Sequence, residues 1–271
     1  MSLLKKTLSN LGIGEAKVDA EVTDHVLCPG QSKTMTVHLY GGSSSQRIES
    51  VKVNLQCWYW SEPGLSSMEE DQDTAVATRE QSWYSLWQWQ QSRSFELGGG
   101  QRQDLSVDVT VPWNTPLTID ESKLWLESTI IDERGKQTVE YQSLTVRPDA
   151  LMDSIFSYLE SLGFRLRQVR CEACDGLWSP FGQTFEWVPI DGPFHGYLRE
   201  LTIFMCRDQD TLQLWFDIDR RQRGEVTMFG SAVAQGHYLR HVSLHAELSH
   251  ADVVEQLAAV FAHCESEVVF S

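Results

Sequence analysis

The first half of the chain alternates hydrophobic and polar residues over four separate stretches. A period of two is typical of a strand with one buried and one solvated face. Such half-buried strands belong to antiparallel sheets, because parallel sheets are covered on both faces. Pro-Gly and Gly-rich segments separate the stretches, which predicts a β-sandwich. The positions expected to face inward are Val18, Ala20, Val22, Met35, Val37, Leu39, Val51, Val53, Leu55, Leu105, Val107, Val109 and Val111.

The pattern changes at Pro148, which disfavours helix in the residue before it. Asp149 can cap a helix, and apolar residues then recur at helical spacing as far as Gly163, so we expect a helix near 149–162. Period-two alternation returns at 201–205 and 212–218. Ser249 and Asp252 resemble a capping box and predict a last helix near 249–262.

These patterns predict a mainly β chain, built from two tandem antiparallel β-sandwich domains with a few helices. The domains are expected at residues 1–147 and 149–271, with the boundary at Pro148. The segment from Glu62 to Ser82 is polar and contains an acidic run at 69–73. It has no glycine at the turn that a calcium loop requires, so it is interpreted as a solvated loop.

Charge narrows the range of partners. The chain has 22 Lys and Arg against 38 Asp and Glu, a net charge of −16. A chain this acidic repels phosphate backbones, so nucleic acid is not an expected partner. No apolar run reaches the about 18 residues of a membrane span, and no signal-peptide core follows Met1. We therefore expect a cytoplasmic protein with no membrane span.

Motifs that carry chemistry are weak. Cys171 and Cys174 form a lone C-x-x-C without the second pair that zinc requires, and turn residues follow it where a redox motif opens a helix. His237, His241 and His245 are spaced by four, but the alternation around them is that of a strand. On a strand this spacing separates side chains by about 13 Å, which is too far for one metal ion.

Catalytic signatures are also missing from the sequence. There is no Gly-x-Ser-x-Gly elbow and no phosphate-binding loop, and Asp217 and Asp219 are interpreted as surface acids. We expect the six cysteines to be reduced and mostly buried. The sequence thus predicts no catalytic residue, no cofactor-binding residue and no metal ligand.

Tryptophans are the most informative residues, since there are 10 and they cluster. Strand alternation predicts that Trp83, Trp87 and Trp89 share one face, and likewise Trp58 and Trp60. One interpretation is an aromatic platform for a protein partner or a sugar. The other is cross-strand pairing that stabilises the sheet. Trp83, Trp87 and Trp89 are the candidate interaction patch.

Several segments together resemble the bacterial stage-zero sporulation-control protein M family, over about residues 1–265. The resemblance is carried by residues 8–20, Pro29-Gly-Gln31, Gly41-Gly42, 161–173, Phe185-Glu-Trp-Val-Pro189, Gly192-Pro-Phe-His-Gly196 and Asp219-Arg-Arg221. It implies an arrestin-like fold of two tandem antiparallel β-sandwiches and a cytoplasmic regulatory or scaffold protein without catalytic residues. The Trp-rich stretch and the histidines near 241 match no motif of that family.

The function predicted from all of this is non-catalytic. The chain is expected to act through protein–protein interaction with an unidentified protein partner or through self-association. The alternative is a β-sandwich that binds a carbohydrate or another small ligand on its Trp-rich face. Solvent exposure of the tryptophans distinguishes a binding surface from a sheet core.

Overall fold

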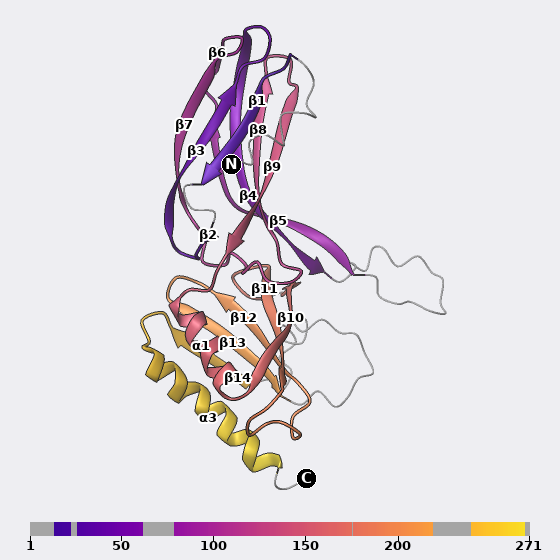
Figure 1. The fold of residues 1–271 in the computed structure, drawn as a ribbon, viewed down its shortest axis with the longest axis vertical. Helices are drawn as coiled ribbons and strands as arrows, with labels where there is room; N and C mark the ends of the chain where they lie inside the picture. Colours follow the sequence, from indigo (N-terminus) through magenta and orange to yellow (C-terminus); the bar gives the residue numbers. More distant parts are fainter. Residues whose placement is uncertain (1–13, 23–25, 62–78, 175, 219–239, 269–271) are drawn as a thin grey trace, which may run out of the picture.

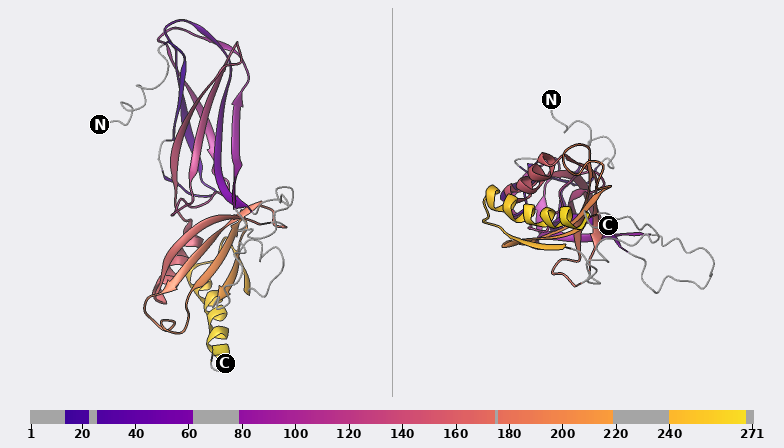
Figure 2. Two further views of the ribbon diagram at one scale, coloured as in Figure 1. Left: turned by 90° about the vertical axis from the view of Figure 1, so that its right-hand side faces the viewer. Right: turned by 90° about the horizontal axis from the view of Figure 1, so that it is seen from below.

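The structure is a computed structural model that describes residues 14–22, 26–61, 79–174, 176–218 and 240–268. Figures 1 and 2 show two halves stacked along the long axis of the molecule. The first half consists of two sheets packed face to face. In the described residues, the second half is a sheet with two helices on one face (Figure 1). The chain is therefore mainly β, as the sequence predicts.

The first half contains a small sheet and most of a large mixed one. The small sheet has the order β1-β3-β7, with strands Lys17–Val22, Ser32–Tyr40 and Arg102–Thr110. In the large sheet β4 pairs with β5, β6 and β8. β8 pairs with β9, and β9 pairs with β2, which lies at the edge of the sheet. These strands are β2 Val26–Leu27, β4 Gln46–Ser61, β5 Glu80–Gln91, β6 Phe95–Leu97, β8 Leu124–Asp132 and β9 Gln137–Val146.

Period-two alternation places the core of the first half correctly. Of the 13 positions predicted to face inward, 12 are buried, and Leu105 packs against them while partly exposed. β8 and β9 add residues such as Leu126 and Leu144 to the same core. Polar residues occupy the alternate positions, so each sheet has one apolar face, and the two apolar faces pack against each other.

The described part of the second half has one sheet layer and one helix layer. The strands β10 to β14 are antiparallel neighbours in chain order. Helices α1 and α3 lie on one face of this sheet (Figure 1). The sequence predicted a second sandwich here; where a second sheet was expected, the apolar faces of the helices cover the strands. The strands are Phe164–Ala173, Phe181–Pro189, Leu201–Arg207, Thr211–Ile218 and Arg240–His245.

Both helices begin where the sequence predicts. α1 spans Ala150–Ser161, and its N-cap Asp149 accepts a hydrogen bond from the backbone nitrogen of Met152 at 2.8 Å. α3 spans His250–Val268. Ser249 and Asp252 form the reciprocal capping box. The Ser249 hydroxyl and backbone nitrogen both donate to the Asp252 carboxylate, which lowers its pKa.

The two halves share one sheet and one core. β10 runs parallel to the end of β4, where Glu172 lies opposite Trp60. The side chains of Tyr59 and Tyr84 pack on Phe181 of the second half, with ring centroids 5.3 and 5.5 Å away. Buried apolar side chains form a contiguous cluster that extends through both halves. Separate domains at 1–147 and 149–271 stay a prediction.

Candidate functional site

The Trp-rich strand β5 is split by a β-bulge. Leu55 of β4 lies opposite Trp87 and the next residue, Gln56, lies opposite Ser85, so Leu86 is the extra residue. A one-residue shift turns every following side chain to the other face of the sheet. The prediction that Trp83, Trp87 and Trp89 share one face is therefore wrong.

The bulge gives these tryptophans different environments. Trp87 and Trp89 lie opposite the buried Leu55 and Val53 and pack against the core. Trp83 points to the outer face and is 59% exposed. Two of the rings thus pack in the sandwich, and the third lies on its surface, where the interaction patch stays a prediction.

Trp83 is part of an aromatic surface on the outer face of β5, β4, β8 and β9. Gln56 lies opposite Trp125, and Glu127 lies opposite Tyr141. Five side chains from these four strands enclose an open cleft of about 570 Å³, which is in the size range of ligand sites. We call it the outer cleft, lined by Gln56, Trp83, Trp125, Glu127 and Tyr141.

Trp125, Tyr141 and the polar pair Gln56 and Glu127 were missed by sequence reasoning. A usable signal exists, because Leu124 and Leu126 alternate with Trp125 as buried residues. An aromatic residue in the solvent-facing phase of a strand therefore marks an exposed ring. Tyr141, which is 55% exposed, lies in the same phase of β9.

Hydrogen bonds fix the polar side chains of the outer cleft. Gln56 Oε1 accepts from Asn54 Nδ2, and Gln56 Nε2 donates to Glu127 Oε2, both at 3.1 Å. Thr129 Oγ1 donates to the other carboxylate oxygen of Glu127 at 3.4 Å. Burial, followed by the charge of Glu127 and a hydrogen bond to it, raises the pKa of Tyr141. Glu127 is thus the charged side chain among the five that line the outer cleft.

Trp58 and Trp60 share a face, as predicted, but are not among the residues that line the outer cleft. Their rings pack edge to face with centroids 5.2 Å apart. Trp60 Nε1 donates to Glu121 Oε2 at 3.1 Å. Trp58 lies opposite Trp83, so this pair extends the aromatic surface toward the end of β4.

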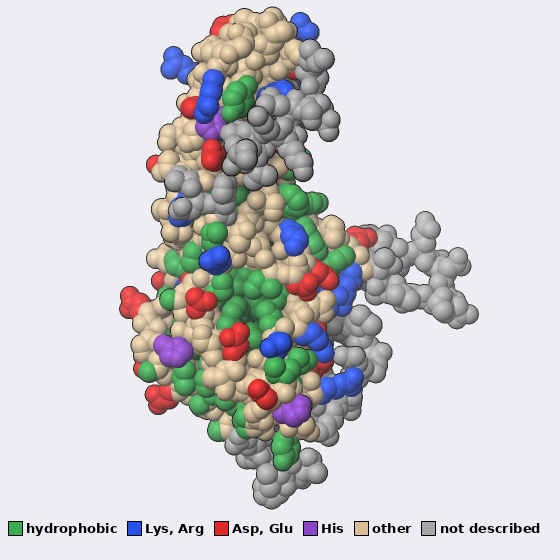
Figure 3. Space-filling model, in the orientation of Figure 1, with side chains coloured by type: hydrophobic (Ala, Val, Ile, Leu, Met, Phe, Trp, Pro, Cys, Tyr) green, Lys and Arg blue, Asp and Glu red, His purple; other side chains and the backbone are tan. Residues whose placement is uncertain are grey.

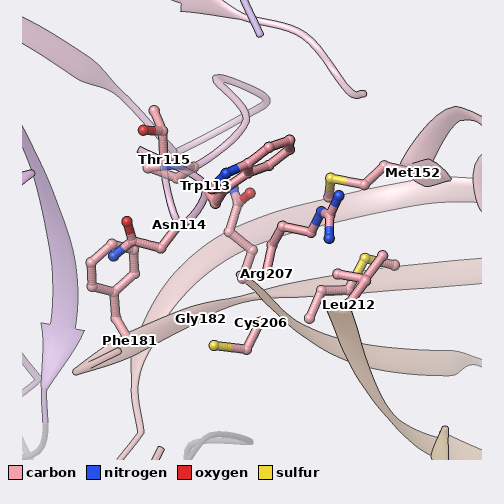
Figure 4. Close-up of a pocket in the computed structure, with 12 residues that line it drawn as sticks. Trp113, Asn114, Thr115, Met152, Phe181, Gly182, Cys206, Arg207 and Leu212 are labelled. Atoms are coloured by element: carbon pink, nitrogen blue, oxygen red, sulfur yellow. The ribbon is translucent and has the colours of Figure 1, made fainter. Parts of the chain in front are cut away.

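A second cavity lies at the junction of the two halves (Figure 4). Its volume of about 20 Å³ is the size of one water molecule. Arg207 is buried here: its guanidinium carbon lies 4.7 Å from the Trp113 ring centroid, and its Nε donates to Asp149 Oδ2 at 3.1 Å. The Gln183 side chain forms two hydrogen bonds across the junction. Its Oε1 accepts from the backbone nitrogen of Leu117 at 2.8 Å, and its Nε2 donates to the backbone oxygen of Leu117 at 3.0 Å. This region joins the halves and is too small for a ligand.

The C-x-x-C cysteines are buried and on separate sides of the second sheet. Cys171 belongs to the main core, whereas Cys174 packs with Phe204 and Cys206 on the other face. Burial raises the pKa of Cys171 and of Cys206 to about 12. Thiols that hold their protons this tightly are poor nucleophiles and poor metal ligands.

The histidines of β14 lie on a strand, as predicted. His241 stacks on Trp215 at a centroid distance of 4.8 Å and bonds to Gln213 at 2.7 Å. Burial lowers its pKa. His237 and Asp219, as well as the acidic run at 69–73, lie outside the described residues.

Within the described ranges, no three His, Cys, Asp or Glu side chains are placed to hold a metal ion. Among those same residues no helix is long and apolar enough to cross a membrane. Figure 3 shows acidic and basic side chains interspersed on one face of the molecule. His38 of the small sheet lies in a mixed-charge group of this kind. Its Nδ1 is 2.8 Å from Asp104 Oδ1, and its Nε2 is 3.5 Å from Glu21 Oε2.

Comparison with known proteins places the chain in a family. A family model described as "SpoOM protein" matches residues 4–222, well over half of the chain. The chain belongs to the Spo0M family. The resemblance inferred from residues 8–20 and 161–173 is thereby confirmed.

Two relatives within the Spo0M family support this placement. The chain is 27% identical over 226 residues to the sporulation-control protein spo0M of Bacillus subtilis (strain 168). The aligned region covers 83% of each of the two chains. The crystal structure of Spo0M from Bacillus subtilis matches with a TM-score of 0.77 at 24% identity, covering 94% of this chain and 100% of the other. The structural match shows a shared fold over nearly the whole molecule.

Proposed function

We propose that this Spo0M-family protein is a non-catalytic cytoplasmic regulatory or scaffold protein that acts through protein–protein interaction. Its interaction surface is the outer face of β5, β4, β8 and β9, centred on the outer cleft. The observation that carries the proposal is the exposure of Trp83 and Tyr141, which line one cleft with Trp125 on the outer sheet face. Aromatic side chains are the residues that most often dominate protein interfaces.

The buried chemistry of the molecule favours the same proposal. The buried Cys171 thiol, whose pKa burial raises to about 12, is a poor nucleophile, and the junction cavity has no room for a substrate. A catalytic site needs convergent titratable groups with an orienting partner, whereas the outer cleft contains one carboxylate among aromatic rings. An arrestin-like arrangement of two stacked β units, which presents broad sheet faces, is part of this proposal.

Site-specific photocrosslinking in the source organism tests the proposal. Benzoylphenylalanine replaces Tyr141 in three versions of the full chain: otherwise unchanged, with Trp83→Ala, and with Trp178→Ala. Trp178 is a matched control, since it is 50% exposed but belongs to the second half.

The expected result is a covalent adduct with a protein, or with a second copy of this chain, that is lost in Trp83→Ala and kept in Trp178→Ala. The same adduct in all three versions, or no protein adduct at all, would contradict the proposal. A carbohydrate adduct at position 141 would favour the alternative, a sugar-binding β-sandwich.

A further inference from the structure

The residues of the outer cleft combine aromatic faces with one negative charge. Trp83, Trp125 and Tyr141 supply rings whose faces carry negative potential, and Glu127 supplies a carboxylate. The fifth lining residue is Gln56, so no lysine or arginine is among the five. Rings and carboxylate therefore attract the same kind of ligand, a cation.

The hydrogen bonds of the outer cleft leave an acceptor for a ligand. Gln56 Oε1 accepts from Asn54, and one N–H of the Gln56 amide donates to Glu127. Glu127 receives hydrogen bonds from Gln56 and Thr129. A carboxylate has about four acceptor positions, so one further donor can be accommodated. A guanidinium only donates and carries a positive charge, so it matches the free acceptor and the negative charge of Glu127, whereas a neutral sugar gains nothing from that charge.

The protein already uses this combination internally. At the junction, the guanidinium of Arg207 lies over the ring of Trp113 at 4.7 Å and donates to the carboxylate of Asp149 at 3.1 Å. The outer cleft has the ring and the carboxylate, and its lining has no cation. Arginine suits such a site better than lysine, because its planar group stacks on rings and pairs with carboxylates.

We propose that the outer cleft binds the guanidinium of an arginine on the partner protein, stacked between Trp83 and Trp125 and hydrogen-bonded to Glu127. This proposal rests on the proposed function, since it names the chemistry of the partner at the same surface. The net charge of −16 favours a basic partner segment as well.

Lys52 is a cation of this chain that lies near the outer cleft on the same face. It is exposed and lies opposite Thr129, two residues along β4 from Asn54, which lies opposite Glu127. It does not line the outer cleft. Because it competes for the charge of Glu127 from the rim, Lys52→Met is expected to keep or strengthen arginine binding.

Nuclear magnetic resonance of the full chain tests the proposal with defined probes. The indole Nε1–H signals of Trp83 and Trp125 are followed while acetyl-Gly-Ser-Arg-Ser-Gly-amide is added. The same peptide with citrulline in place of arginine has nearly the same shape without the charge, and cellobiose tests the sugar alternative. Glu127→Gln removes the carboxylate charge, and Trp178→Ala is the matched surface control.

The arginine peptide is expected to shift the indole signals of both Trp83 and Trp125. Its Kd should be at least about tenfold lower than that of the citrulline peptide. Glu127→Gln should raise the Kd by about tenfold, and Trp178→Ala should leave it unchanged. Equal binding of the two peptides, tighter binding of cellobiose, or no effect of Glu127→Gln would overturn the proposal.

The two proposals fail in different ways. If crosslinking at position 141 depends on Trp83 but arginine and citrulline peptides bind equally, the protein-interaction function stands and the arginine inference is wrong. If the arginine peptide binds as expected but no protein adduct forms, the cation site stands and the protein-interaction function is wrong.

Discussion

The junction between the halves and the outer cleft contain the same chemical groups in two states. At the junction, Arg207 lies over Trp113 and pairs with Asp149, so ring, cation and carboxylate all belong to one chain and are closed off from solvent. In the outer cleft, Trp83 is 59% exposed, and the five lining residues include the carboxylate of Glu127 but no lysine or arginine. The first arrangement holds the fold together, whereas the second leaves its binding capacity for another molecule.

The difference follows from where each set lies in the sheets. The junction groups come from the ends of strands and from the N-cap of α1, where the two halves pack together and exclude water. The outer-cleft groups come from the middle of four paired strands, on the face away from the core. A solvated sheet face gives up little stability when its side chains are changed, so it is free to be used for binding.

The largest expected effect is at the junction. Arg207→Ala removes the partner of Asp149 and leaves that carboxylate, whose side chain is only 13% exposed, without its cation, so the free energy of unfolding should fall by about 3–5 kcal/mol. Urea unfolding followed by tryptophan fluorescence measures it. The control is Arg47→Ala, which breaks an exposed pair with Glu49 and should cost no more than about 1 kcal/mol. Similar losses in both variants would show that the junction pair adds nothing special.

A second prediction separates the tryptophans that the bulge divides. Trp87→Ala should lower the free energy of unfolding by about 3 kcal/mol, because the ring packs against the core. Trp83→Ala should change it by less than about 1 kcal/mol, since the ring is mostly solvated. The same urea experiment measures both. Equal losses would mean that Trp83 is also part of the core and that the outer cleft is not preformed.

This division could not be read from alternation alone. Period two predicted the inward positions of β1, β3 and β4, because the apolar residues that mark them alternate without interruption. The irregularity of β4 lies between Ile48 and Ser50, before the first of these residues, Val51. In β5 the phase changes between Leu86 and Trp87, two large apolar neighbours. Such a pair does signal a bulge, but the sequence does not say which of the two phases faces the core. That depends on the register with β4, which is a tertiary property.

The helices were easier to predict than the layer that they cover. Asp149 and Ser249 are local caps, and their bonding partners lie three residues away. Whether the second sheet packs on helices or on another sheet depends on contacts far apart in the chain, such as Phe156 of α1 on Trp187 of β11. The outer cleft is likewise assembled from four strands, so only Trp83 was predicted from the sequence.

A third prediction concerns a substitution that gives the outer cleft the same three groups as the junction: a ring, a carboxylate and a guanidinium. Gln56→Arg places a guanidinium of the chain itself beside Trp125 and Glu127. Stability should rise by no more than about 1 kcal/mol, because the new pair is exposed to solvent. The Kd for the arginine peptide should rise by at least about tenfold, since the site is already filled. Unchanged peptide binding, measured by the same indole signals, would place the peptide elsewhere.

The smallest expected effect is electrostatic and concerns Tyr141. Burial raises the pKa of its hydroxyl, and the charge of Glu127 and a hydrogen bond to it raise that pKa further. The folded state therefore holds this proton more tightly than the unfolded state does. The resulting stability is fully present below the ordinary tyrosine pKa and is lost as the pH rises through the raised value.

Glu127→Gln should lower the pKa of Tyr141 toward its ordinary value without restoring it fully, because burial remains. Titration of the chain with ¹³C-labelled tyrosine rings measures this shift, and Tyr141→Phe identifies the signal. Tyr40 is an internal control: its pKa is raised by burial and by acidic residues of the small sheet, and Glu127 is not among the causes. If the Tyr141 titration is the same with and without the Glu127 charge, the carboxylate does not set the potential of the outer cleft. The attraction for arginine would then have to come from the rings alone, and the likeness between the outer cleft and the junction would be limited to its aromatic half.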